Sequence, residues 1–195
     1  MIKSISNKIA EYIAKDDETA DIEEIAYGYD LLLQELGVVV VSLIIGFVLN
    51  ITLQVVISVF FYNTLRMYAG GAHANYRAVC IITSILIMFG PALLFTRTPF
   101  FFPIIAYPII YMFCLLMLFL YAPADTETQP IQNLETRKII KRKAILALTV
   151  LFIIASITNI WLPDYASIML VIIIIVCTFT HSIIYRLFGC KKSIQ

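Results

Sequence analysis

The chain has 195 residues, of which 61% are hydrophobic, and its formal net charge is +1. Charged residues make up 14% of the chain, well below the roughly 25% that is typical of soluble domains, and the mean hydropathy is +0.92. Because the apolar residues form long runs, the composition excludes an ordinary soluble domain and indicates a membrane protein. The length suits one domain, and we expect residues 1–195 to form it.

The N-terminal segment predicts a helix that lies on the membrane surface. Within 2–15 the apolar side chains recur at helical spacing, and the lysines lie away from this stripe or at its edge. An amphipathic helix of this kind buries one face among lipid headgroups. The segment has no continuous apolar core and is followed by acidic residues, so we do not expect a cleaved signal peptide.

Six apolar runs follow, and each approaches the ~20 residues that a helix needs to cross the hydrocarbon. The second is short enough to be tilted or re-entrant. The fold class is therefore expected to be all-α, a polytopic membrane protein with about six transmembrane helices. We place the spans near 31–49, 51–66, 78–95, 104–121, 144–162 and 166–188.

The positions of the basic residues predict the orientation of these spans. If both termini are cytoplasmic, all of the 14 lysines and arginines except Arg97 fall on the cytoplasmic side. The positive-inside rule favours this arrangement. We therefore expect a multi-pass protein of the cell membrane whose termini and 66–80 loop face the cytosol. No CxxC pair occurs and the cytosol is reducing, so we expect neither a disulfide nor a metal site.

The segment 69–80, AGGAHANYRAVC, separates the second and third apolar runs. Cys80 falls in the predicted first turn of the third run, where unpaired backbone N–H groups create a partial positive charge that favours a thiolate. His73 lies seven residues earlier, in a stretch that Gly70 and Gly71 allow to turn back. A Cys–His pair performs nucleophilic acyl transfer, and helix N-terminal amides can hold the oxyanion. The simpler alternative is a structural cysteine and a solvated histidine.

Three segments carry recognisable motifs in a fixed order: IAYGYDLLL at 25–33, RMYAGGAHANYRAVC at 66–80 and YAPADTETQPI at 121–131. The second resembles the signature of the accessory gene regulator B (AgrB) family of membrane peptidases, in which Gly-Gly-x-His-Ala precedes a Cys seven residues after the His. The third is similar to the family's Ala-Pro-x-Asp-Thr segment, and the first is similar to its early Tyr-Gly motif. The resemblance covers essentially the whole chain.

This resemblance implies a membrane cysteine endopeptidase, with Cys80 as the nucleophile and His73 as the general base and acid. The implied substrate is a small membrane-associated quorum-sensing pro-peptide. The family cuts this peptide near its C-terminus and closes a thiolactone or lactone through a Cys acyl-enzyme. A homodimer within the lipid bilayer is also implied, and we expect no cofactor, metal or nucleic-acid partner. A membrane peptide exporter without proteolytic activity and a non-enzymatic scaffold remain alternatives.

Further residues are candidates for supporting roles. Glu35 or Asn75 could orient the imidazole of His73, although interfacial solvation or a helix–helix hydrogen bond explains Glu35 equally simply. The basic cluster that contains Lys141 could hold an acidic peptide tail, or it could serve topology and anionic lipid alone. The candidate substrate-binding residues are Arg66, Gly70, Gly71, Asp125 and Lys141.

Overall fold

The computed structural model describes residues 2–14, 22–72, 76–98, 101–125 and 133–190. These residues form eight α-helices, and the described part of the chain contains no strand beyond one isolated backbone bridge. The expected all-α class is therefore confirmed for this part. In chain order the helices are α1 (Ile2–Ile13), α2 (Ile22–Val48), α3 (Thr52–Ala69), α4 (Arg77–Arg97), α5 (Ala106–Tyr121), α6 (Leu134–Thr158), α7 (Pro163–Thr178) and α8 (Ser182–Leu187).

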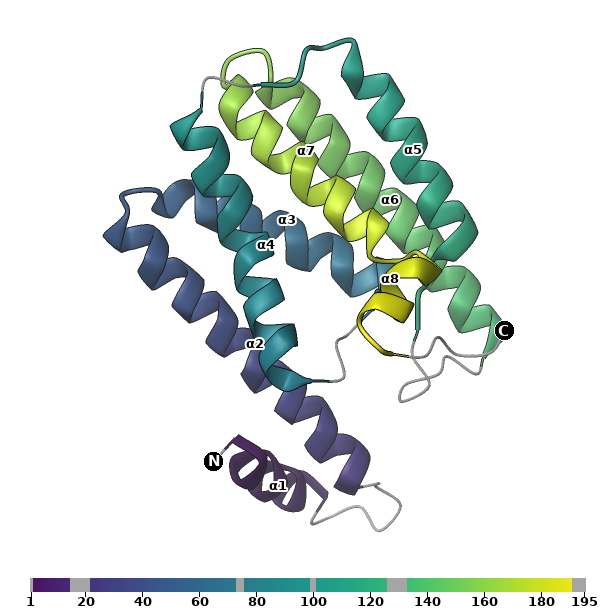
Figure 1. The fold of residues 1–195 in the computed structure, drawn as a ribbon. Helices are drawn as coiled ribbons and strands as arrows, with labels where there is room; N and C mark the ends of the chain where they lie inside the picture. Colours follow the sequence, from purple (N-terminus) through teal and green to yellow (C-terminus); the bar gives the residue numbers. More distant parts are fainter. Residues whose placement is uncertain (1, 15–21, 73–75, 99–100, 126–132, 191–195) are drawn as a thin grey trace.

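Helix α7 is the centre of the bundle. It contacts α3, α4, α5 and α6 (Figure 1). Its sequence is apolar on nearly every side, and side chains such as Leu170, Ile173 and Val176 are fully buried. A helix that is apolar all round needs partners all round, which explains its central position. Pro163 in its first turn and Asp164 beside the positive helix end favour the start of α7 at this point.

Helix α2 is also apolar, but its large side chains lie on the surface. Leu36, Val40, Ile44 and Phe47 are all exposed. A protein in water rarely exposes a contiguous apolar surface of this kind, so the outer face of α2 is suited to contact with lipid.

Two helical segments of the described chain are long and apolar enough to cross a membrane, Ile25–Val48 and Arg77–Arg97. Ala106–Tyr121 and Pro163–Thr178 are shorter apolar helices. The predicted spans near 51–66, 78–95 and 104–121 each coincide with one helix of the bundle. The crossing of a bilayer by six helices stays a prediction.

The predicted single span over 166–188 is wrong, because the helix breaks after Thr178. In a continuous helix the carbonyl of Phe179 would accept from the amide of Ile183. Instead, the Phe179 carbonyl accepts from the amide of Ala72 at 3.1 Å, and the Ile183 amide donates to Nδ1 of His181 at 3.1 Å. The last part of the chain is therefore a separate short helix, α8, capped by His181.

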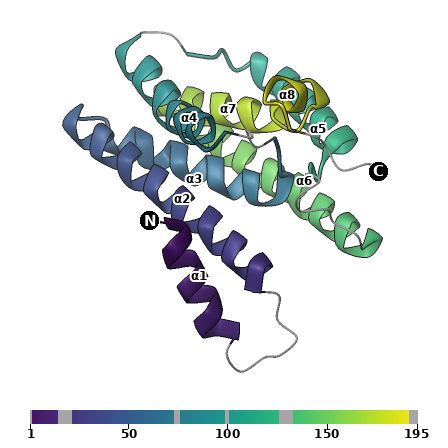
Figure 2. The same cartoon turned by 60° about the horizontal axis from the view of Figure 1, so that its bottom comes forward.

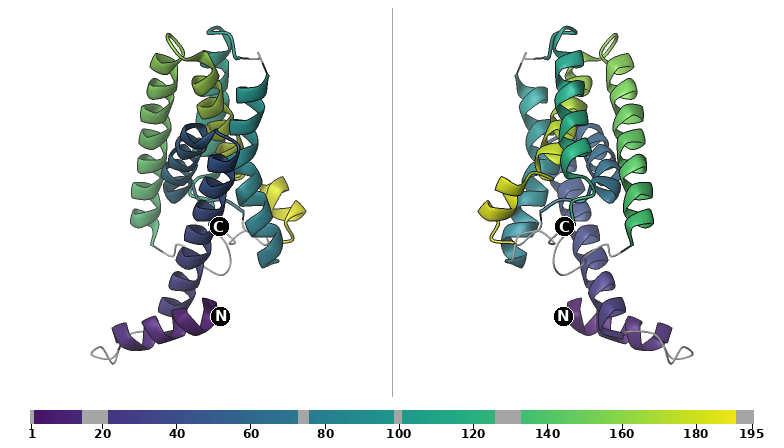
Figure 3. Two further views of the ribbon diagram at one scale, coloured as in Figure 1. Left: turned by 90° about the vertical axis from the view of Figure 1, so that its left-hand side faces the viewer. Right: turned by 90° about the vertical axis from the view of Figure 1, so that its right-hand side faces the viewer.

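Helix α1 lies across one end of the bundle, beside the start of α2 (Figures 2 and 3). The side chains that it buries are small, Ser6 and Ala10. Ile5 and Tyr12 are exposed, as they would be on a helix that contacts a membrane surface. The interfacial location of this helix stays a prediction.

Candidate active site

Cys80 lies in the first turn of α4, which begins at Arg77. Tyr76 is the N-cap residue of α4, and its carbonyl accepts the amide of Cys80 at 3.1 Å. The Cys80 side chain is half-buried and lines a small cavity between α3, α4 and the segments that follow α7 and α8. The other residues that line the cavity are Tyr62, Arg66, Ala72, Thr83, Ser84, Ile87, Phe179 and Phe188.

The cavity is narrow in this conformation. The space that it leaves for the centre of a water-sized sphere is about 10 Å³, which is room for about one water molecule. A peptide can therefore reach Cys80 only if lining side chains move. Phe179 and Phe188, whose ring centroids lie 5.6 Å apart, form the aromatic side of the cavity. A closed apolar wall of this kind excludes bulk water, and water would compete with an acyl-transfer reaction.

The glycine turn before His73 is fixed by backbone hydrogen bonds from two distant segments. The 122–125 segment supplies two of them: the amide of Gly71 donates to the carbonyl of Ala124, and the amide of Ala124 donates to the carbonyl of Ala69, both at 2.9 Å. The segment after α7 supplies the third through the carbonyl of Phe179 and the amide of Ala72. The second and third sequence motifs are thus in direct contact.

Glycine is required at both positions of this turn. Gly70 has φ +71° and ψ −149°, and Gly71 has φ +137°; these are backbone conformations that other residues rarely adopt. A Cβ atom on Gly70 would also collide with the carbonyl oxygen of Ala124, and one on Gly71 would lie 3.1 Å from Nη1 of Arg66. The glycines therefore allow the turn to approach both the 122–125 segment and the arginine side chain.

Arg66, in the last turn of α3, extends into the cavity below this turn. Its Nη2 donates to the carbonyl of Ala72 at 2.9 Å. Its guanidinium lies between two aromatic rings, 5.5 Å from the ring centroid of Tyr62 and 5.9 Å from that of Phe179. Cation–π contacts of this kind stabilise a cation in apolar surroundings. Nη1 of Arg66 is buried and has no hydrogen-bond partner among the described residues.

Glu35, the carboxylate that was a candidate for orienting the imidazole, lies on α2 near this arginine. Arg66 is the charged group that acts electrostatically on its carboxylate. Oε1 of Glu35 is buried without a hydrogen-bond partner in the described part of the chain. Both Glu35 and Cys80 also act on the hydroxyl of Tyr62, which interacts with Ser84. A carboxylate, a guanidinium, a phenol and a thiol therefore share one small region.

The side chain of Asp125 is not positioned for direct contact with a substrate. Its side chain is only 2% exposed and forms a 2.8 Å ion pair with Arg137 of α6. The same arginine nitrogen lies 3.4 Å from the carbonyl oxygen of Pro123. This pair fixes the 122–125 segment on α6, and through the Ala124 hydrogen bonds it supports the glycine turn.

The structure brings some of the predicted site residues together and leaves others apart. Arg66 and Cys80 line the cavity. Gly71 does not line it, but its backbone lies close to Nη1 of Arg66. Lys141 does not line it; its Nζ lies 4.7 Å from the ring centroid of Phe119. His73 and Asn75 lie outside the described residues, so the Cys–His pair stays a prediction. The neighbour of His73, Ala72, does share the cavity with Cys80.

Several cavity residues carry no motif and were not predicted. Tyr62, Ser84 and Phe179 come from α3, α4 and the break after α7, and only tertiary packing brings them together. Tyr185 of α8 packs with Ala72 and Ala124 in a small buried cluster. Burial raises the pKa of Tyr185, so its phenol stays protonated at neutral pH. No group of three potential metal ligands occurs in the described part of the chain.

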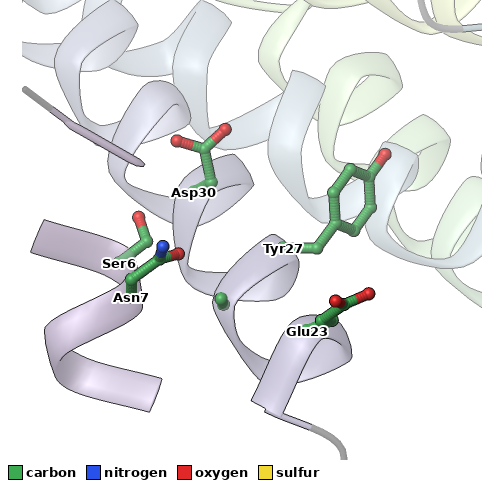
Figure 4. A pocket seen from close by; sticks show the side chains of 6 residues that line it. Ser6, Asn7, Glu23, Tyr27 and Asp30 are labelled. Carbon is green, nitrogen blue, oxygen red and sulfur yellow. The ribbon is translucent and has the colours of Figure 1, made fainter. Parts of the chain in front are cut away.

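A second hollow, of ≈ 290 Å³, lies between α1 and α2. Figure 4 shows residues that line it: Ser6 and Asn7 of α1, and Glu23, Tyr27 and Asp30 of α2. Asp30 also forms a 3.1 Å ion pair with Arg77, the first residue of α4. This hollow therefore adjoins the turn of α4 that carries Cys80.

Comparison with known proteins identifies the family. Residues 6–184 match the family model described as Accessory gene regulator B. The chain belongs to the AgrB family. It is 33% identical over 159 residues to AgrB-like protein 2 of Clostridium perfringens strain 13, which covers 77% of this chain and 73% of that protein.

Two further relatives show a similar level of identity. The chain is 32% identical over 153 residues to an AgrB-like protein of Clostridium perfringens strain SM101, with 76% and 71% of the two chains covered. An AgrB-like protein of Listeria monocytogenes serotype 4a is also 32% identical over 153 residues, with 75% and 73% covered. No solved structure matches the chain.

Membership of the AgrB family confirms the resemblance found in the three motifs. Together with the two apolar helices of membrane length, it indicates a membrane protein. It also fits a role in the processing of quorum-sensing peptides.

Proposed function

We propose that this AgrB-family protein is a membrane cysteine endopeptidase that cuts a small quorum-sensing pro-peptide near its C-terminus and cyclises the product. The observation that carries the proposal is that Cys80 and Ala72, the residue directly before His73, line the same cavity. In this proposal His73, which follows Ala72 in the chain, acts on the thiol of Cys80. We further propose that the enzyme acts as a homodimer in the cell membrane, with its catalytic loop facing the cytosol.

The chemistry follows the pattern of covalent catalysis by a Cys–His pair. His73 takes the thiol proton, and the sulfur of Cys80 adds to the scissile carbonyl carbon, which places the electron pair of the C=O bond on oxygen. When this intermediate collapses, the C–N bond breaks, and His73 gives the proton to the leaving amine of the C-terminal tail. The substrate is then held as a thioester on Cys80.

Ring closure resolves this thioester. A Cys or Ser side chain of the substrate loses its proton to His73 and attacks the thioester carbonyl. Its sulfur or oxygen forms the new bond to carbon, and the Cys80 sulfur leaves and is reprotonated. Because the attacking group belongs to the bound peptide, it acts at a high effective molarity. The narrow, partly aromatic cavity supports this route because it limits the access of water to the thioester.

The test is co-expression of the chain with the small reading frame beside its gene, followed by mass spectrometry of the peptide products. Cys80→Ala and His73→Ala should each stop cleavage while the protein still accumulates in the membrane. Cys190→Ala is the matched control, because Cys190 is the other half-buried cysteine and does not line the cavity. It should cleave normally.

The alternatives predict different products. If the protein is an exporter, the Cys80→Ala variant should still give cleaved peptide, but the peptide should no longer appear outside the cell. A scaffold would show no processed peptide with any variant, including the natural sequence. Either result would reject the peptidase.

A further inference from the structure

The cavity contains a strong hydrogen-bond donor that nothing in the described structure uses. Nη1 of Arg66 is buried, and no acceptor lies within hydrogen-bonding distance among the described residues. Leaving a buried charged donor without a partner is costly, and each such group in a native structure calls for an explanation. The other terminal nitrogen, Nη2, is occupied by the carbonyl of Ala72. The hydrogen bond from Nη2 thus fixes the guanidinium, and Nη1 can donate to a bound ligand.

The guanidinium cannot turn away easily from this position. Tyr62 and Phe179 flank it with their rings, and the backbone of Gly71 lies so close that a Cβ atom would come within 3.1 Å of Nη1. A donor that is fixed before the reaction begins loses little energy in reorganisation. Arg66 is therefore a preorganised cation in the wall of the cavity that Cys80 also lines.

The donor that would otherwise stabilise an oxyanion is already used. In many acyl-transfer enzymes the backbone N–H of the nucleophile points at the developing oxyanion. Here the Cys80 amide donates to the carbonyl of Tyr76 within the first turn of α4. A substrate oxygen that approaches Cys80 therefore finds no free N–H on the nucleophile itself. Nη1 of Arg66, which has no partner among the described residues, lies in the wall of the same cavity.

We propose that Nη1 of Arg66 donates the hydrogen bond that stabilises the oxyanion when Cys80 attacks the scissile carbonyl. As the sulfur–carbon bond forms, the electron pair of the C=O bond moves to oxygen, and that oxygen accepts from Nη1. The pair returns when the C–N bond breaks, and Arg66 keeps its proton throughout. The same donor serves the second oxyanion, formed when the substrate side chain attacks the thioester. This inference rests on the proposed peptidase function.

Glu35 has a supporting part in this arrangement. Its carboxylate lies close enough to interact electrostatically with Arg66. The two side chains do not form one of the ion pairs found among the described residues. A nearby opposite charge stabilises the buried cation, while the absence of a direct ion pair leaves Nη1 available to substrate.

The experiment uses the full-length protein in proteoliposomes with the pro-peptide identified by co-expression. Removing one oxyanion donor typically lowers kcat by about 10²–10³-fold. Arg66→Met should therefore lower kcat by about this factor and leave KM within about threefold, because the lost bond strengthens only in the transition state. Arg186→Met is the control, since Arg186 is exposed on α8 and does not line the cavity; it should retain the natural kcat.

A second measurement separates oxyanion stabilisation from a structural role. Alkylation of Cys80 by iodoacetamide displaces iodide at an sp³ carbon and forms no oxyanion. When it is measured at a pH at which the thiol is fully ionised, so that loss of a nearby cation does not change the thiolate fraction, its rate should be unchanged, within about threefold, in Arg66→Met. If alkylation and cleavage fell together, Arg66 would act only by shaping the loop, and the proposal would be rejected. A natural kcat in Arg66→Met, or a change in KM alone, would reject it too.

A conservative variant covers the case in which Arg66→Met does not fold. Arg66→Lys keeps one cationic nitrogen, which can hold the Ala72 carbonyl, but has no second nitrogen for the substrate. It should fold and show a kcat at least about tenfold below that of the natural protein; an unchanged kcat would overturn the assignment. Cleavage by Cys80→Ala would instead show that the peptidase proposal itself has failed, whatever Arg66 does.

Discussion

Two arginines near the same end of the bundle illustrate two uses of a guanidinium. Arg137 of α6 meets a buried carboxylate, Asp125, at 2.8 Å. Arg66 of α3 has the carboxylate of Glu35 nearby, but one of its nitrogens donates to a backbone carbonyl and another has no partner in the described part of the chain. Both arginines hold a loop in place, Arg137 the 122–125 segment and Arg66 the turn at Ala72.

The two arginine sites differ in whether their buried hydrogen-bonding groups have partners. The Arg137–Asp125 contact pairs a cation with an anion, so we interpret it as structural. At the Arg66 site a buried donor and a buried acceptor have no partner among the described residues, although such groups destabilise a fold. Cavities with this property are candidates for chemistry, because a bound substrate can supply the missing partners. Four predictions test this comparison.

The largest expected effect is the loss of the buried ion pair. Asp125→Ala should lower the free energy of unfolding by about 3 kcal/mol, because it leaves Arg137 largely buried and unpaired. The measurement is denaturant-induced unfolding in detergent micelles. Adding Arg137→Met should restore part of the loss. Asp164→Ala, at an exposed position, is the control, and equal stability of Asp125→Ala and Asp164→Ala would contradict the structural role.

The next effect concerns the contact between the two loops that these arginines support. Gly70→Ala should lower the free energy of unfolding by about 1–3 kcal/mol, because alanine is strained at φ +71° and its methyl group would meet the Ala124 carbonyl. Cleavage should fall as well, since the turn positions the cavity wall. Gly37→Ala, where a methyl group meets nothing within 4 Å, should not destabilise. If both variants behaved alike, the loop contact would not matter.

A smaller effect is expected at the start of the helix that carries Arg137. The side chain of Asn133 caps α6 by accepting the amides of Glu135 at 2.8 Å and Thr136 at 3.4 Å. Asn133→Ala should lower the free energy of unfolding by about 1 kcal/mol. Asn133→Asp, which keeps the acceptor, should retain most of it. Equal losses in the two variants would show that capping is not the cause.

The smallest expected effect is the loss of an ion pair formed by a third arginine, Arg77. Arg77 pairs with Asp30 at 3.1 Å, but its side chain is 36% exposed. Arg77→Met should therefore change the unfolding free energy by less than about 1 kcal/mol. The effect should shrink further as salt is added, because exposed charges are screened. A loss as large as that of Asp125→Ala would mean that exposure does not distinguish the two ion pairs.

Much of the helical framework was predictable from the sequence. The apolar runs near 51–66, 78–95 and 104–121 each contain one observed helix within a few residues, because long apolar segments favour helices of that length. Cys80 was expected in a first helical turn and lies there. The run over 166–188 misled the prediction, since its apolar composition continues across the break after Thr178.

The candidate site was only partly predictable. Gly70, Gly71 and Cys80 carry a motif, so they could be found without a structure. Asp125 carries one too, yet its partner Arg137 could equally have been assigned to topology. Nothing in the sequence marks Tyr62 or Phe179 as neighbours of Arg66.

From the amino-acid sequence alone it follows that the chain forms apolar helices, that its motifs fall at their ends, and that it belongs to the AgrB family. These properties depend on local composition, spacing and residue identity. Which segments meet depends on the tertiary structure. The glycine turn packs on the 122–125 segment, and α7 ends where the carbonyl of Phe179 accepts a hydrogen bond from the amide of Ala72. The guanidinium of Arg66 lies close to the rings of Tyr62 and Phe179. Such choices depend on contacts between residues distant in sequence, which no local pattern records.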